Sequence, residues 1–160
     1  MRELTIAPFQ SSDKPDLIEV IDSVCADTLW MQTRRFEPTP AWEHALEHED
    51  CSDHLLALAK VEGRVVGWCR LFPVESQPGV VELGIGVLRS YRQQGVGEAL
   101  IGYGVEWGKG RSVSEIVLTT HGENRPAIGL FEKVGFGERC RYEFLLRMKF
   151  NLSSQAEIGM

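Results

Sequence analysis

The sequence predicts one α/β domain built around a mixed β-sheet. Short apolar strand-like runs alternate with amphipathic helical patterns along the 160-residue chain. The pair Glu62-Gly63 separates two of these runs, which is typical of a tight antiparallel hairpin. A further apolar run, residues 80–87, leads through a loop with two glycines directly into an amphipathic helix at 95–109. A hairpin and strand–loop–helix units in one chain indicate a mixed sheet flanked by helices.

Length and composition agree with a single folded domain. A chain of this size buries a substantial core, and its 43% hydrophobic content argues against disorder. The net charge of −6 argues against nucleic acid as a partner, and no apolar run is long enough for a membrane span. We find no repeat or linker, so we expect a domain over residues 1–150 and a frayed tail over 151–160. The absence of a signal-peptide pattern predicts a cytoplasmic protein.

The N-terminal elements follow from caps and periodicity. Residues 4–8 form a strand candidate, and Ser12 or Asp13 can cap a helix that starts near Pro15. Thr39 and Pro40 repeat the cap-and-proline start for a short second helix. The apolar stripes of these two helices are Leu17, Ile18, Ile21, Val24, Cys25 and Leu29 in the first, and Trp42, Ala45 and Leu46 in the second.

Strands at 55–61 and 64–72 flank the hairpin pair, and residues 73–79 form a turn before the 80–87 strand. Three consecutive apolar residues predict a buried strand at 115–120. Asn124 starts a helix with Pro126 in its first turn, and Gly135 is expected as its left-handed C-cap. Residues 141–149 are expected to form a last strand.

The most informative segment is the loop that contains Arg92, Gly95 and Gly97, directly before the helix. A helix N-terminus exposes unpaired N–H groups and a positive dipole end, and glycines allow close approach, so the loop suits a phosphate or pyrophosphate. A dinucleotide fingerprint requires a third glycine, which is absent. A phosphate-binding loop requires Gly-Lys-Ser/Thr, but Gly108-Lys109 is followed by glycine.

Two blocks in residues 80–136 resemble the GNAT superfamily of acyl-CoA-dependent N-acyltransferases. The first is the strand followed by Arg92-x-x-Gly95-x-Gly97, similar to the family's cofactor loop. The second, similar to the following helix of that family, is Asn124-x-x-Ala127-x-x-Leu130-Phe131-Glu132-Lys133-Val134-Gly135-Phe136. The resemblance implies a mostly antiparallel sheet in which the parallel strands 80–87 and 115–120 splay apart and form a slot for acetyl-CoA. The implied cofactor-binding residues are Ile85, Val87, Arg92, Gln93, Gln94, Gly95, Val96, Gly97, Asn124 and Phe131.

The resemblance implies direct attack of a primary amine, on a small molecule or peptide, on the thioester. Glu82 is the expected general base, acting directly or through a water, with His121 as the alternative. Side chains alternate along a strand, and many relatives carry this glutamate one residue earlier, at the position of Val81. A β-bulge is one way to restore the direction of Glu82.

Phe131 departs from the family pattern, because relatives usually have tyrosine there as the general acid for the leaving thiolate. Water or Tyr142 can substitute, and a thiol with a pKa of about 8.5 is already a fair leaving group. The alternative is a non-catalytic acyl-CoA-binding or regulatory module.

In this family the segments corresponding to 30–36 and 139–142 line the acceptor pocket. The arginines of these segments favour an anionic acceptor, whereas nearby acidic residues favour a cationic one. The charge of the acceptor therefore stays open. A homodimer through the last strand also stays open. Scattered cysteines without paired spacing predict reduced thiols and no metal site; these are Cys25, Cys51, Cys69 and Cys140.

Overall fold

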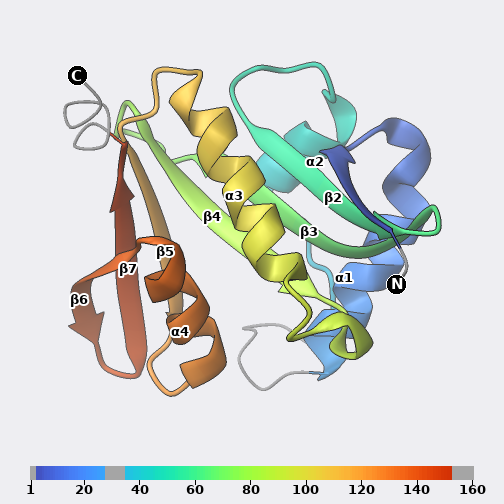
Figure 1. Ribbon diagram of the computed structural model, residues 1–160. Helices are drawn as coiled ribbons and strands as arrows, with labels where there is room; N and C mark the ends of the chain where they lie inside the picture. The colour runs from blue at the N-terminus through green and yellow to red at the C-terminus, as the bar shows by residue number, and fades with distance from the viewer. Residues whose placement is uncertain (1–2, 28–34, 153–160) are drawn as a thin grey trace.

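The computed structural model describes residues 3–27 and 35–152, and its described strands form one seven-stranded sheet in the order β1-β2-β3-β4-β5-β7-β6 (Figure 1). The strands are β1 (Leu4–Pro8), β2 (Leu55–Val61), β3 (Arg64–Pro73), β4 (Val80–Val87), β5 (Glu115–His121), β6 (Gly137–Tyr142) and β7 (Leu145–Asn151). The helices are α1 (Lys14–Asp27), α2 (Pro40–Glu47), α3 (Val96–Lys109) and α4 (Arg125–Val134), with the short 3-10 turns η1 (Ser11–Asp13) and η2 (Arg89–Tyr91). None of the helices in the described ranges has the length and apolar character needed to cross a bilayer.

The sheet is mixed, as expected. Among the described strands, neighbours pair antiparallel except β4 and β5, which are parallel because α3 connects them. This confirms the predicted mostly antiparallel sheet with one parallel pair.

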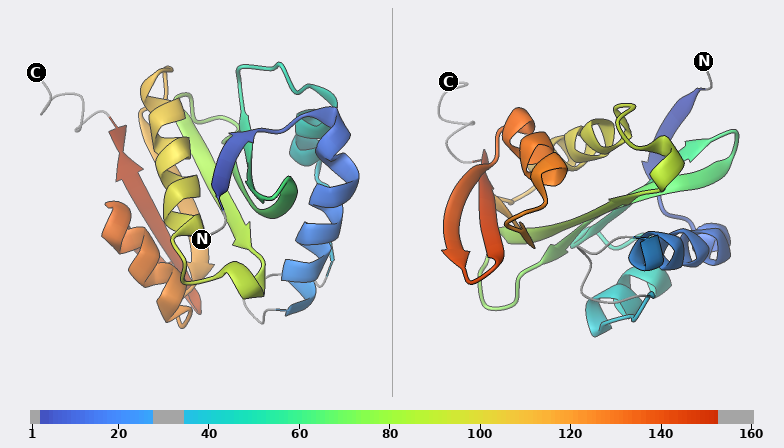
Figure 2. Two further views of the ribbon diagram at one scale, coloured as in Figure 1. Left: turned by 45° about the vertical axis from the view of Figure 1, so that its right-hand side comes forward. Right: turned by 90° about the horizontal axis from the view of Figure 1, so that it is seen from below.

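Helices cover both faces of the sheet, with α3 and α4 on one face and α1 and α2 on the other (Figure 2). The core under α3 and α4 takes alternate strand residues such as Leu71, Leu83 and Leu118. The opposite core under α1 and α2 takes the intervening positions, including Trp68 and Phe72. The face that a residue of β4 presents therefore follows from its parity in the strand.

The C-terminal region corrects one sequence-based prediction. Residues 141–149 do not form one strand: β6 and β7 form a hairpin that turns at Glu143, whose φ is 54°. The turn was missed because it carries no glycine, proline or asparagine to mark it. Ordered structure also extends past residue 150, since Asn151 pairs with Glu115 and Leu152 is buried in the core; residues 153–160 lie outside the described ranges.

Three other turn and cap predictions are confirmed, whereas Ser12 and Asp13, the predicted caps of the first helix, lie inside η1 directly before α1. Glu62 and Gly63 both have positive φ, as a two-residue hairpin turn requires. The Thr39 hydroxyl accepts a hydrogen bond from the Trp42 amide at 3.3 Å, which caps α2. Gly135 ends α4 in the left-handed conformation.

Candidate active site

The parallel strands β4 and β5 separate at their C-terminal ends. Their pairing begins at Val80 and ends where Glu82 meets Val117, although β4 continues to Val87 and β5 to His121. On its other edge β4 stays paired with β3 from Val81 to Val87, and β5 stays paired with β7. The facing edges beyond Glu82 therefore lack strand partners, which confirms the predicted splayed pair.

The loop after β4 is held in a strained, specific path to the start of α3. Gln93 has a φ of 60° and Gly95 a φ of 86°, so two of its residues are left-handed. Arg92 Nε donates a hydrogen bond to the Val87 carbonyl at 2.9 Å, and Arg92 Nη2 lies 3.6 Å from Asp27. Arg92 thus fastens the loop both to the end of β4 and to the end of α1.

The two glycines of the loop serve different purposes. Gly95 is the N-cap of α3, and its positive φ strains any residue with a Cβ. Gly97 lies in the first helical turn, where an added Cβ would come within 2.9 Å of the Leu130 side chain on α4. A side chain at Gly97 would also point toward Ile85, 4.0 Å away, at the side of the opening. The first turn of α3 therefore packs closely against Leu130 beside Ile85 of β4, and its first N–H groups have no partner within the helix.

Helix α4 flanks the other side of the opening. Asn124 is its N-cap, and its side-chain oxygen accepts a 3.4 Å hydrogen bond from the Ala127 amide. Phe131 is buried, and its ring centroid lies 5.9 Å from that of Phe136. The structure places Phe131 among hydrophobic core residues.

Glu82 lies at the last paired position before the strands separate. Val81 and Leu83 are buried on the α3 side, so Glu82 faces the α1–α2 side of the sheet. The β3–β4 register is continuous, so no bulge is needed to give it this direction. Glu82 therefore points away from the α3 face, and its side chain is 40% exposed.

A model of the acetyltransferase (GNAT) family matches residues 21–136, nearly three quarters of the chain. The chain belongs to the GNAT acetyltransferase family. The fold agrees: a putative acetyltransferase from Salmonella typhimurium, solved with its cofactor acetyl-CoA, superposes with a TM-score of 0.80 at 17% identity, covering 94% of each chain. A ribosomal-protein-alanine N-acetyltransferase from Brucella melitensis gives a TM-score of 0.78 at 22% identity, covering 92% of this chain and 99% of that one.

A curated relative is similar over part of the sequence. N-alpha-acetyltransferase 30 from Schizosaccharomyces pombe is 34% identical over 67 residues, or 42% of this chain. The aligned region spans 43% of that relative, so the likeness covers less than half of its length.

In this GNAT domain, Glu82 has a cationic neighbour that the sequence analysis missed. Arg70 Nη2 lies 3.6 Å from Glu82 Oε1, and its guanidinium carbon lies 4.8 Å from the centre of the Phe72 ring. Burial lowers the pKa of Arg70, and the Glu82 carboxylate opposes this shift. Gly84 leaves the space that Arg70 occupies, since an added Cβ would come within 2.5 Å of its side chain. Arg70 and Glu82 meet because β3 pairs antiparallel with β4, and the sequence alone does not show which residues of two paired strands lie side by side.

Buried aromatic side chains continue from Phe72 toward α2 in this GNAT domain. Trp42 lies edge-on to Phe72, with ring centroids 5.3 Å apart, and Phe36 lies edge-on to Trp42 at 5.2 Å. Phe36 belongs to the expected acceptor segment 30–36; residues 30–34 lie outside the described ranges.

The other expected acceptor residues lie across the opening, near the β6–β7 turn. His121 stacks on Phe144 with ring centroids 5.4 Å apart, and its Nδ1 accepts from the Glu123 amide at 3.2 Å. Tyr142 and Phe144 are 68% and 60% exposed. Val117 pairs with Glu82, and His121 lies four residues after Val117 on the same strand. His121 therefore points to the same face of the sheet as Glu82.

Proposed function

We propose that this protein is an acetyl-CoA-dependent N-acetyltransferase that moves an acetyl group to a primary amine of a small molecule or peptide. The observation that carries the proposal is the gap between β4 and β5, which opens beside the first turn of α3 at Gly97. Membership of the GNAT family and the acetyl-CoA named in the Salmonella structure support it. The Brucella neighbour is named a ribosomal-protein-alanine N-acetyltransferase and the fission yeast relative an N-alpha-acetyltransferase, which supports a peptide amine among the candidate acceptors.

The coenzyme would occupy the gap between β4 and β5 and pair with the free edge of β4. Its pantetheine arm would pair with the backbone of β4 from Ile85 to Val87, and its pyrophosphate would lie on the amides of Gln93 to Gly97. Within that stretch, the side chains of Gln94 and Val96 need no direct contact, because the main chain provides the donors. Arg92 would hold the loop in position, and Asn124 and Phe131 would contact the arm from α4.

Direct attack then needs a neutral amine at the thioester carbon. An alkyl amine with a pKa of about 10.4 is protonated at neutral pH, so it must lose a proton first. Glu82 would take this proton, directly or through a water, and Arg70 would hold its carboxylate in place. The new C–N bond would form as the C–S bond breaks, the attacking nitrogen would release its second proton to water, and the thiolate would take a proton from solvent or Tyr142. His121 remains the alternative base.

A second function is favoured by one observation. Phe131 replaces the usual tyrosine, and its buried ring offers no proton to the thiolate. A non-catalytic acyl-CoA-binding or regulatory module would bind the coenzyme by the same contacts without turnover.

The deciding experiment has two parts. Purified protein is incubated with acetyl-CoA and a panel of amines, from amino acids and polyamines to peptides with free N-termini, and thiol release is measured. Thermal shifts with CoA, NAD and ATP are measured in parallel, since a ligand at 100 times its Kd adds about 2.7 kcal/mol. Stabilisation by CoA with turnover supports the enzyme. Stabilisation without turnover for the whole panel supports the binding module, and stronger stabilisation by NAD or ATP contradicts both.

A further inference from the structure

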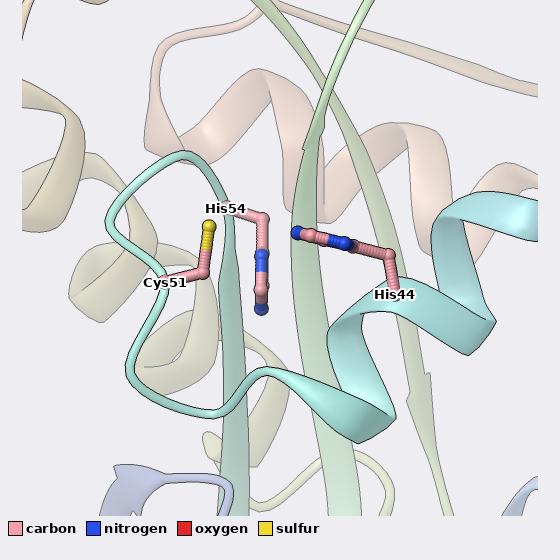
Figure 3. Close-up of side chains that lie close together, drawn as sticks. All are labelled: His44, Cys51 and His54. Atoms are coloured by element: carbon pink, nitrogen blue, oxygen red, sulfur yellow. The ribbon is translucent and has the colours of Figure 1, made fainter.

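The segment that connects α2 to β2 brings three metal-ligating side chains together. His44 comes from α2, Cys51 from the connection, and His54 from the residue directly before β2. One ligand atom from each lies within 4.8 Å of the other two. Figure 3 shows the His54 imidazole between the Cys51 thiol and the His44 imidazole. This cluster plays no part in the acetyl-transfer proposal above.

His54 is unusual because it is buried with an unpaired polar atom. Its residue exposure is 7%, and its Nδ1 has no hydrogen-bond partner in the structure. A buried polar atom without a partner has given up its hydrogen bonds to water and gained none in the protein, which destabilises the folded state. The unpaired nitrogen of His54 belongs to a ring that lies beside the Cys51 thiol and the His44 imidazole. This arrangement suggests a bound species that contacts all three side chains.

The backbone fixes the spacing of the cluster. The His48 amide closes α2 on the His44 carbonyl at 2.9 Å, and the Cys51 amide bonds the His48 carbonyl at 3.1 Å, so the chain turns back on itself. The His48 ring stacks on the His44 ring at 4.3 Å, which limits the rotation of His44. This turn places the pattern His44-x6-Cys51-x2-His54 on one side of the connection.

We propose that His44, Cys51 and His54 form a binding site for a divalent transition metal ion, with Zn²⁺ as the best match. A thiolate and two imidazoles are the ligands that Zn²⁺ prefers, whereas Mg²⁺ and Ca²⁺ prefer oxygen. Three protein ligands leave one tetrahedral position for water. This site was not predicted from the sequence, because the prediction rested on the four cysteines alone and their spacing shows no pair.

Access and charge also suit a cation. Cys51 and His54 line a surface pocket of about 500 Å³, whose wall also includes Glu49 and Asp50. The negative charges of Glu49 and Asp50 attract a cation to this pocket.

The first test is cobalt spectroscopy on the full-length protein, stripped of metal by a chelator and held under reducing conditions. Co²⁺ bound to a thiolate gives an intense near-ultraviolet charge-transfer absorption. We expect this band in the unaltered protein and in Cys140→Ser, whose thiol is exposed and remote in the sequence from the cluster. We expect its loss in Cys51→Ser. No saturable band in the unaltered protein, or the same band in Cys51→Ser, would overturn the proposal.

The second test uses two thiols of one molecule as reporter and control. Zn²⁺ should slow alkylation of Cys51 at least tenfold and leave Cys140 unchanged, and Mg²⁺ should affect neither. Cys69 does not interfere, because burial raises the pKa of its thiol to about 12. Equal alkylation of Cys51 with and without Zn²⁺ would contradict the proposal.

His44→Ala provides a variant that should fold, because His44 is exposed on α2. Loss of even an outer-shell partner weakens metal binding about 10–100-fold, so loss of this ligand should weaken Zn²⁺ affinity by about 100-fold or more. Competition with a chromophoric chelator measures the affinity, and far-ultraviolet circular dichroism checks the fold. Unchanged affinity would remove His44 from the site. None of these readouts depends on acetyl transfer.

Discussion

The two edges of β4 differ in a way that separates stability from function. Toward β3 the strand pairs from Val81 to Val87 without a register shift. Toward β5 it pairs only through its first residues, up to Glu82. One edge is closed by the chain itself, and the other is open beyond Glu82. Substitutions near the closed edge should change the free energy of unfolding, whereas substitutions near the open edge should change binding and rate.

The largest effect is expected at the point where the open edge begins. Glu82→Gln keeps the size and the Arg70 contact but removes the base, so kcat should fall about 10²–10⁴-fold while acetyl-CoA affinity holds. Steady-state kinetics with the best amine of the panel measures this. His121→Asn is the matched control and should leave kcat nearly unchanged. A loss in His121→Asn without one in Glu82→Gln would reassign the base.

The closed edge should give the next largest effect. Leu71 is fully buried on β3, opposite Leu83 of β4. Leu71→Ala should lower the free energy of unfolding by about 2–5 kcal/mol, measured by urea denaturation. The affinity of the folded protein for CoA should stay the same. A large loss of affinity with little loss of stability would break the division between the two edges.

Gly97→Glu tests the open edge through the affinity for CoA, without any measurement of catalytic rate. The new side chain would press on Leu130 and put a carboxylate beside the expected pyrophosphate, so CoA affinity should fall about 100-fold or more. Gly102→Glu adds the same charge to an exposed position of the same helix with open space around it, and should change affinity little. Calorimetric titration with CoA measures both. Equal affinities in the two variants would remove the assigned role of the loop.

Phe131→Tyr should give the smallest effect. The leaving thiol has a pKa of about 8.5, so an added acid should change kcat less than tenfold at neutral pH. Single-turnover thiol release measures the chemical step. A larger increase would show that turnover is limited by the missing hydroxyl, and so would favour the binding-module alternative for the natural protein.

Much of the fold could be predicted from the sequence because its signals are local. Glycines and caps fix the starts and ends of elements, as Gly95 and Gly135 do at α3 and α4. The β6–β7 hairpin could not, because Glu143 adopts a positive φ that no sequence pattern announces.

In the candidate site, too, local motifs could be predicted from the sequence, whereas contacts between distant residues could not. The loop around Gly97 is one continuous motif and could be located from the sequence. The ion pair of Arg70 with Glu82 depends on the pairing of β3 with β4, and the direction of Glu82 depends on the register of β4. The cluster around His54 depends on how the connection turns. Each of these needs three-dimensional placement.

The gap beside β4 also gives the sheet an edge in its interior, far from β1 and β6 at its margins. Backbone groups on such an edge exchange hydrogen with solvent and can recruit a stray strand from a neighbouring molecule. Deuterium uptake at the β4 amides that point into the gap beyond Glu82 should consequently be fast in the free protein and slow once the gap is filled. Storage with the filling ligand should suppress aggregation that begins at this edge.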